Sequence, residues 1–143
     1  MIYTQMTKKA IRLMFDKQKE QTDKSGLPYV FHPFHVAEQM SDEDTTICAL
    51  LHDILEDTDI TAEQLLEMGF KPSVVEAIKL VTHDDSVPYM EYIGAIKSNP
   101  IARAVKLADL AHNCDASRLP DTPTPRDLSR IERYKAAIAF LKS

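Results

Sequence analysis

The sequence predicts an all-α protein. Only three glycines occur in 143 residues, and no segment alternates apolar and polar side chains for long. Apolar residues instead recur three and four positions apart, as at Ala10, Leu13 and Met14, which is the spacing of one helical face. The length suits one compact domain, which we assign to residues 1–143. We therefore expect a single-domain bundle of about eight helices.

Proline and capping residues indicate where these helices begin. Pro33 suits the first turn of a second helix, and Thr61 with Gln64 has the pattern of a capping box for a fourth. Glycine or proline marks the loops at residues 23–28 and 119–125. The expected helices cover approximately residues 4–21, 33–40, 47–58, 61–69, 73–81, 88–96, 101–113 and 126–141.

The composition excludes several classes of function. A formal net charge of −5 argues against binding to a nucleic acid polymer, which requires a basic surface. No apolar run reaches the roughly 20 residues of a membrane helix, and the first residues lack a secretory pattern. Two cysteines are too few for a disulfide framework. We expect a cytoplasmic protein in which Cys48 is a buried thiol.

The chemistry is concentrated at residues 51–58. An apolar run leads into His52 and Asp53, and Glu56 and Asp57 follow one turn later. On a continuous helix these four side chains share one face. Burying three carboxylates without a partner would be very costly, so the cluster either faces water or binds a cation. We expect a divalent metal ion.

Other segments must complete such a site, because one helix rarely supplies all ligands of an ion. His32 is the nearest candidate in sequence, and His35 could join it, although we expect His35 to face solvent. Asp109 lies in a run of small and apolar residues and needs a metal or a basic partner if it is buried. The alternative for Asp109 is a surface position. His83 also precedes an aspartate, but no acidic pair follows it, so we expect it to lie outside the metal site.

Two imidazoles and two carboxylates suit Mn²⁺ or Fe²⁺, with coordination positions left for water or substrate. The scarcity of cysteine argues against a structural zinc site.

Three segments resemble the hydrolase domain of the RelA/SpoT family, and most closely its stand-alone members, the small alarmone hydrolases. They are KSGLPYVFHP at residues 24–33, ALLHDILEDT at 49–58, and VKLAD at 105–109 with the His-Asn pair at 112–113. Their order and spacing match over about residues 5–118. This family belongs to the metal-dependent HD-domain superfamily, so the resemblance implies an HD-domain helical bundle.

The resemblance also implies a role for each matched residue. One Mn²⁺ would be bound by His32, His52, Asp53 and Asp109. Glu56 and Asp57 match the pair that handles the attacking water and its protons. Lys24, Ser25 and Asn113 match positions that contact the nucleotide or its phosphates.

The family reaction removes pyrophosphate from the 3′ position of guanosine tetra- or pentaphosphate, the alarmones of the stringent response, and yields GDP or GTP. The implied partner is therefore a small phosphorylated nucleotide. Two positions depart from the family pattern, because Asp23 and Leu110 stand where many members have arginine. The arginine replaced by Asp23 is tied to base recognition, so selectivity for guanine is open.

Two other functions remain open on the sequence. The protein could be an HD-domain phosphatase for another phosphorylated nucleotide, including a dinucleotide cofactor, because the metal and the proton-handling residues would be shared. It could also be a nucleotide-sensing domain that binds a metal without catalysis, although the Glu56 and Asp57 pair argues against this. In the last expected helix, Arg130 and Tyr134 could close over a base or form an ordinary amphipathic face.

Overall fold

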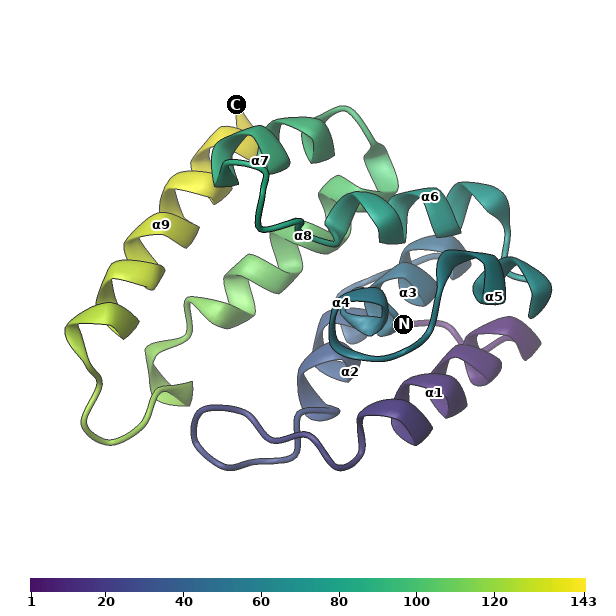
Figure 1. Ribbon diagram of the computed structural model, residues 1–143, viewed down its shortest axis with the longest axis horizontal. Coiled ribbons are helices and arrows are strands. Elements are labelled where there is room, and N and C mark those ends of the chain that lie inside the picture. Colours follow the sequence, from purple (N-terminus) through teal and green to yellow (C-terminus); the bar gives the residue numbers. More distant parts are fainter.

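A computed structural model describes residues 1–143 and contains nine α-helices and no β-strand (Figure 1). The predicted all-α class is confirmed. None of the helices combines the length and apolar character needed to cross a bilayer. The helices are α1 (Gln5–Gln18), α2 (Phe31–Glu38), α3 (Glu43–Leu50), α4 (Ile54–Asp57), α5 (Ala62–Glu67), α6 (Pro72–Val81), α7 (Tyr89–Lys97), α8 (Pro100–Asn113) and α9 (Pro125–Lys142), with a 3₁₀ turn at Ala116–Arg118.

Helices α3 and α8 form the centre of the bundle. Helix α3 packs against α1, α2, α6 and α8, while α8 also packs against α7 and α9. In Figure 1, α8 crosses the molecule between the group formed by α1 to α6 and the pair α7 and α9. Residues 45–51 are all buried, and Cys48 has the predicted inaccessible thiol, whose pKa is raised by burial. The strongly apolar run of α3 therefore fixes the position of the chain that follows it.

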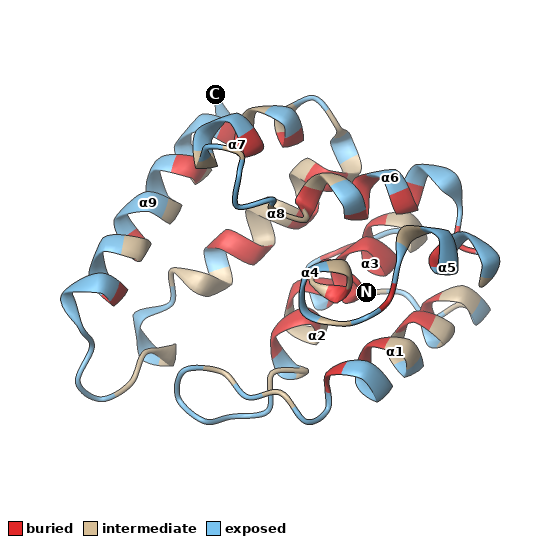
Figure 2. Cartoon of the chain, in the orientation of Figure 1, coloured by how far each residue is buried: buried red, intermediate tan, exposed pale blue.

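Burial follows the inward faces of the helices, as Figure 2 shows. The core is one cluster of 27 buried apolar residues. Helix α9 has its outer side in solvent and buries Ile131, Ala137 and Leu141. This spacing of six and four residues indicates a helix that lies on the bundle along one narrow stripe.

Side-chain caps define several helix starts. The predicted capping box of Thr61 and Gln64 is present at α5, and Thr124 forms an equivalent box with Asp127 at α9. Each cap satisfies backbone N–H groups that have no partner within the helix.

The prediction of one continuous helix over residues 47–58 is wrong. Helix α3 ends at Leu50, and the short α4 begins at Ile54. The backbone of Leu51 (φ −105°, ψ 11°) and Asp53 (φ −103°, ψ 1°) leaves the helical region. The His52 ring nitrogen Nδ1 lies 2.6 Å from the carbonyl oxygen of Ala49, which would accept the next-turn N–H in a continuous helix. The imidazole therefore competes with the helix for this acceptor, and the resulting break adds a ninth helix.

Candidate metal centre and adjoining cavities

Three buried side chains from separate elements meet at helix α8. His32 on α2, His52 in the turn after α3, and Asp109 on α8 each offer one ligand atom, and these atoms lie within 4.8 Å of one another. Asp109 Oδ1 is 2.9 Å from His32 Nε2 and 3.5 Å from His52 Nε2. Asp53 Oδ2 lies 3.1 Å from the same His52 nitrogen. The structure therefore brings together three of the four residues predicted as metal ligands and places the fourth, Asp53, beside His52.

The orientation of His52 leaves one nitrogen directed at the carboxylates. Its Nδ1 is held by the Ala49 carbonyl, and its buried Nε2 has no hydrogen-bond partner of acceptable geometry. Burial lowers the pKa of His52, but the charges of Asp53 and Asp109 outweigh this effect and raise it well above its ordinary value. A position that favours positive charge so strongly is one where a divalent cation can replace a proton.

Asp109 is held by two neighbours on its own helix. Lys106 Nζ lies 2.9 Å from Oδ2, and Asn113 donates from Nδ2 to Oδ1 at 3.0 Å. Burial raises the pKa of Asp109, but the positive charges of Lys106 and His52 hold it well below its usual range. Asp109 is thus buried and ionised, which excludes the alternative of a surface aspartate. Lys106 is the basic partner that such a residue needs, and its spacing of three residues could have identified it.

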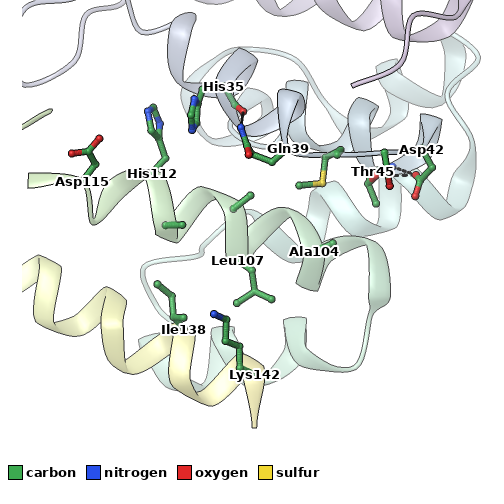
Figure 3. A pocket seen from close by; sticks show the side chains of 14 residues that line it. His35, Gln39, Asp42, Thr45, Ala104, Leu107, His112, Asp115, Ile138 and Lys142 are labelled. Carbon is green, nitrogen blue, oxygen red and sulfur yellow. Dashed lines mark hydrogen bonds between the residues drawn. The ribbon is translucent and has the colours of Figure 1, made fainter. Parts of the chain in front are cut away.

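Two further histidines, His112 and His35, lie next to His32 on the side of its Nδ1 atom. His112 Nδ1 is 2.8 Å from His32 Nδ1, and the His35 ring stacks on His112 with 3.8 Å between ring centres. Figure 3 shows His35 and His112 facing each other from α2 and α8, at one end of a groove of about 690 Å³. Burial and the charge of Arg118 lower the pKa of His112 to about 4, so this ring is neutral at neutral pH and can accept a hydrogen bond from His32 Nδ1–H. His35 lies outside the group of candidate ligands, and its ring is half-buried, stacked on His112 at the edge of the groove.

Asp53 has a partner on the opposite side of the site. The Tyr29 hydroxyl donates a hydrogen bond to Asp53 Oδ2. Burial, followed by the negative charge of Asp53, raises the pKa of Tyr29 above its ordinary value, so the phenol remains a donor. Tyr29 was not predicted as a site residue, although it lies within the first of the three matched segments.

These residues fit a divalent metal ion. They provide two imidazole nitrogens and two carboxylates, a donor set suited to Mn²⁺, Fe²⁺ and similar ions. Each ligand also has an outer partner: Ala49 for His52, His112 for His32, Lys106 for Asp109 and Tyr29 for Asp53. Such outer contacts orient metal ligands and tune their basicity.

Glu56 and Asp57 lie on α4, just beyond these ligands. Glu56 Oε1 accepts a hydrogen bond from the backbone N–H of His83 at 2.9 Å. Burial and the negative charges of Asp53 and Glu56 raise the pKa of Asp57 to about 6. The two carboxylates therefore differ, since Glu56 is fixed by a backbone donor and Asp57 titrates near neutral pH.

Two adjoining cavities lie next to the candidate centre, and the smaller of them reaches two of the candidate ligands. The smaller, of about 200 Å³, is lined by Asp53, Glu56 and Asp109 at one side and by residues of α7 and α9 at the other. The larger, of about 350 Å³, lies between the loop before α2 and helix α9. Both cavities share a boundary formed by Tyr29, Asn113 and Tyr134.

The predicted nucleotide contacts have different positions. Lys24 and Asn113 line the larger cavity, whereas Ser25 donates its hydroxyl to the Arg118 carbonyl at 2.7 Å. Lys24 Nζ also pairs with Asp127 Oδ1 at 3.1 Å and so links the loop to α9.

Both departures from the family pattern have a structural explanation. Asp23 Oδ1 accepts hydrogen bonds from the backbone N–H groups of Ser25 and Leu27, which shapes a loop that turns at Gly26 (φ +81°). The Asp23 carboxylate is therefore occupied within its own loop. Leu110 is fully buried in the core and does not line either cavity.

The C-terminal helix contributes to both cavities. Arg130 lines the larger cavity, and Tyr134 lines both. His83 lies outside the group of candidate ligands, as predicted, and its ring stacks on Tyr92 with 4.5 Å between ring centres.

Comparison with known proteins identifies the family. Residues 10–110 match the HD domain. The chain belongs to the HD-domain family. The matched residues include the adjacent His52 and Asp53, which follow the break after α3 and lie at the candidate centre.

This HD-domain protein is similar to curated hydrolases from animals and bacteria. It is 35% identical over 130 residues to the mouse guanosine-3′,5′-bis(diphosphate) 3′-pyrophosphohydrolase MESH1. The aligned region covers 82% of this chain and 71% of the relative. A guanosine-3′,5′-bis(diphosphate) 3′-pyrophosphohydrolase of Aquifex aeolicus is 36% identical over 110 residues, 68% of this chain and 16% of that protein. The bifunctional (p)ppGpp synthase/hydrolase SpoT of Escherichia coli is 34% identical over a similar share. The predicted relationship to the RelA/SpoT hydrolases is confirmed.

The same fold occurs in a solved structure described as a metazoan ortholog of SpoT that hydrolyzes ppGpp. The two structures align with a TM-score of 0.81 at 24% identity, over 99% of this HD-domain chain and 87% of the other. This likeness confirms the predicted HD-domain bundle.

Proposed function

We propose that this HD-domain protein is a metal-dependent hydrolase that removes pyrophosphate from the 3′ position of guanosine tetra- or pentaphosphate and yields GDP or GTP. The observation that carries the proposal is the buried His52 Nε2, which has no hydrogen-bond partner and lies between two carboxylates beside a cavity. The substrate follows from relatives about 35% identical whose names specify this reaction.

We assign one Mn²⁺ to the candidate centre, with Fe²⁺ as the alternative ion. His32, His52, Asp53 and Asp109 would hold it, in agreement with the preference of these ions for imidazole and carboxylate ligands. When bound, such an ion polarises a phosphoryl oxygen and lowers the pKa of a water molecule. The outer contacts of these ligands keep them oriented toward one point.

Asp57 is our candidate general base and Glu56 its partner. A base is most effective when its pKa lies near the working pH, and the pKa of Asp57 is raised to about 6. Glu56 contributes negative charge to this shift while its Oε1 is held by the His83 N–H. In this assignment Asp57 takes the proton of the attacking water, and Glu56 maintains the charge that makes Asp57 basic.

The two cavities differ in volume, and each would hold a different part of the substrate. Pockets for whole organic ligands usually enclose about 300–1,000 Å³, so the larger cavity of about 350 Å³ suits the nucleoside. The smaller cavity of about 200 Å³ is lined by two of the candidate ligands, Asp53 and Asp109, and suits the 3′-pyrophosphate. Lys24 and Asn113 would contact the nucleotide, and Ser25 would hold the Lys24 loop through the Arg118 carbonyl.

A substrate panel tests the proposal. The Mn²⁺-loaded protein would be incubated with guanosine tetraphosphate, with its adenosine counterpart and with a dinucleotide cofactor bearing a ribose phosphate. Released pyrophosphate and orthophosphate would be measured separately. We expect pyrophosphate and GDP from the guanosine substrate. Orthophosphate alone, or turnover only of the dinucleotide, would instead indicate an HD-domain phosphatase.

A further inference from the structure

Two polar groups in the wall of the smaller cavity have no partner within the protein. The Tyr89 hydroxyl is buried and forms no hydrogen bond. Arg133 is an exposed residue that also lines this cavity, and it takes part in none of the salt bridges of the molecule. The buried hydroxyl lacks the acceptor that buried polar groups normally have, and the guanidinium beside it has no carboxylate partner, so an anionic ligand in this cavity can satisfy both.

The two side chains are held against each other. The guanidinium carbon of Arg133 lies 4.3 Å from the centre of the Tyr89 ring and 5.9 Å from that of Tyr134. Cation–π contacts of this length fix the position of the guanidinium without using its N–H donors. Arg133 therefore remains able to form two parallel hydrogen bonds with a phosphate.

A short chain of side-chain contacts joins this pair to the candidate metal centre. Lys106 joins Asp109 at 2.9 Å and stands over the Tyr92 ring at 5.3 Å, and the Tyr92 and Tyr89 ring centres are 5.9 Å apart. The charge of Lys106 is already matched by Asp109. Arg133 is consequently the one cation lining this cavity whose charge no carboxylate pairs with.

Tyr89 is a donor under ordinary conditions. Burial raises the pKa of its phenol, although Lys106 and Arg133 act in the opposite direction. The hydroxyl therefore keeps its proton at neutral pH and can donate it to an anionic oxygen.

We propose that Arg133 and Tyr89 bind the outer phosphate of the 3′-pyrophosphate, the one further from the ribose. The proposal rests on the proposed function for the identity of the substrate. The inner phosphate would lie beside the candidate metal ligands, and the outer phosphate would reach the α7 and α9 wall. This pair would therefore make the protein prefer a 3′-diphosphate over a 3′-monophosphate.

Binding of inorganic pyrophosphate tests the pair independently of catalysis. Calorimetric titrations with Mn²⁺ in excess over both protein and pyrophosphate would compare the wild type with Arg133→Gln and Tyr89→Phe. Arg126→Gln is the matched control, because it removes the same charge from an exposed position on α9 that lines neither cavity. Melting temperatures would verify that each variant is folded.

We expect Arg133→Gln to weaken pyrophosphate binding about 10- to 100-fold, as for the loss of a charged hydrogen bond. Tyr89→Phe keeps the ring under Arg133 and should weaken binding less, and Arg126→Gln should bind as the wild type does. Equal affinity of Arg133→Gln and Arg126→Gln would overturn the inference, as would a wild type that fails to bind pyrophosphate. If pyrophosphate binding depends on Arg133 but guanosine tetraphosphate yields no GDP, the proposed function fails and this site stands.

Discussion

At the residue scale, the candidate centre depends on which nitrogen of each imidazole carries a proton. The Ala49 carbonyl fixes the proton of His52 on Nδ1 and frees Nε2. His112 fixes the proton of His32 on Nδ1 in the same way, because its lowered pKa of about 4 keeps its ring a neutral hydrogen-bond acceptor. Outer contacts of this kind commonly change metal affinity 10- to 100-fold.

Replacing His112 should therefore weaken the metal site without removing a ligand. We expect His112→Phe, which retains an aromatic ring but accepts no hydrogen bond from His32, to lower Mn²⁺ affinity about 10- to 100-fold. His112→Gln, whose side-chain oxygen can accept from His32, should lose less. Competition with a fluorescent chelator measures both. Unchanged affinity in the phenylalanine variant would show that His112 does not orient His32.

The pH profile should reveal the base. With a pKa of about 6, Asp57 is protonated and inactive below this pH, so kcat/KM should rise as the pH increases through about 6. Glu56→Gln keeps an acceptor for the His83 N–H but removes a negative charge that raises this pKa. The acid limb should then move to lower pH. A limb that stays in place in this variant would exclude Asp57 as the titrating base.

Single residues differ in how well the sequence predicts them. The grouping of His32, His52 and Asp109, with Asp53 beside His52, was predictable because these ligand-type residues stand in recognisable local motifs. Lys106 could have been predicted from its helical spacing to Asp109. The contact of His112 with His32 joins residues 80 positions apart, so no local pattern reports it.

At the scale of elements, the break between α3 and α4 is the feature that sequence periodicity missed. Apolar spacing continues through residues 47–55, so the pattern alone favours one helix. The buried imidazole of His52 takes the Ala49 carbonyl, and this tertiary contact outweighs local propensity. The break separates His52 and Asp53, which we propose as metal ligands, from Glu56 and Asp57 on α4, which we propose as the proton-handling pair.

Helix α9 forms the wall of both cavities, and its first turn ties it to the loop before α2. Asp127 completes the capping box with Thr124 and also pairs with Lys24 at 3.1 Å. We expect Asp127→Ala to destabilise the first turn of α9 locally, because it removes one half of the capping box, and to raise KM, because Arg130 and Tyr134 lose a fixed position. Metal content should not change.

Hydrogen exchange of the α9 amides measures this local effect. Glu132→Ala is the control, since it removes a carboxylate from an exposed pair with Lys135 at 3.4 Å on the same helix and should have little effect. Equal exchange rates in both variants would contradict a role for Asp127 in holding the wall.

At the scale of the whole molecule, the fold gathers cations and carboxylates at the same two cavities of an acidic protein with a net charge of −5. Lys24, Arg118 and Arg130 line the larger cavity together with three aspartates, and Lys106 and Arg133 line the smaller one together with Asp53, Glu56 and Asp109. Arg118, Arg130 and Arg133 form no salt bridge, so their charges remain available to a polyphosphate. The all-α class was predictable from composition and period, whereas the arrangement of α9 over the cavities depends on long-range packing.

The central claim is that a metal ion at this centre enables release of pyrophosphate from guanosine tetraphosphate. The most direct measurement titrates Mn²⁺ into metal-stripped protein and quantifies GDP, pyrophosphate and bound metal together. We predict no turnover without metal, and recovery in proportion to one bound ion per chain, with GDP and pyrophosphate formed in equal amounts. Turnover that persists without metal, or orthophosphate in place of pyrophosphate, would contradict the claim.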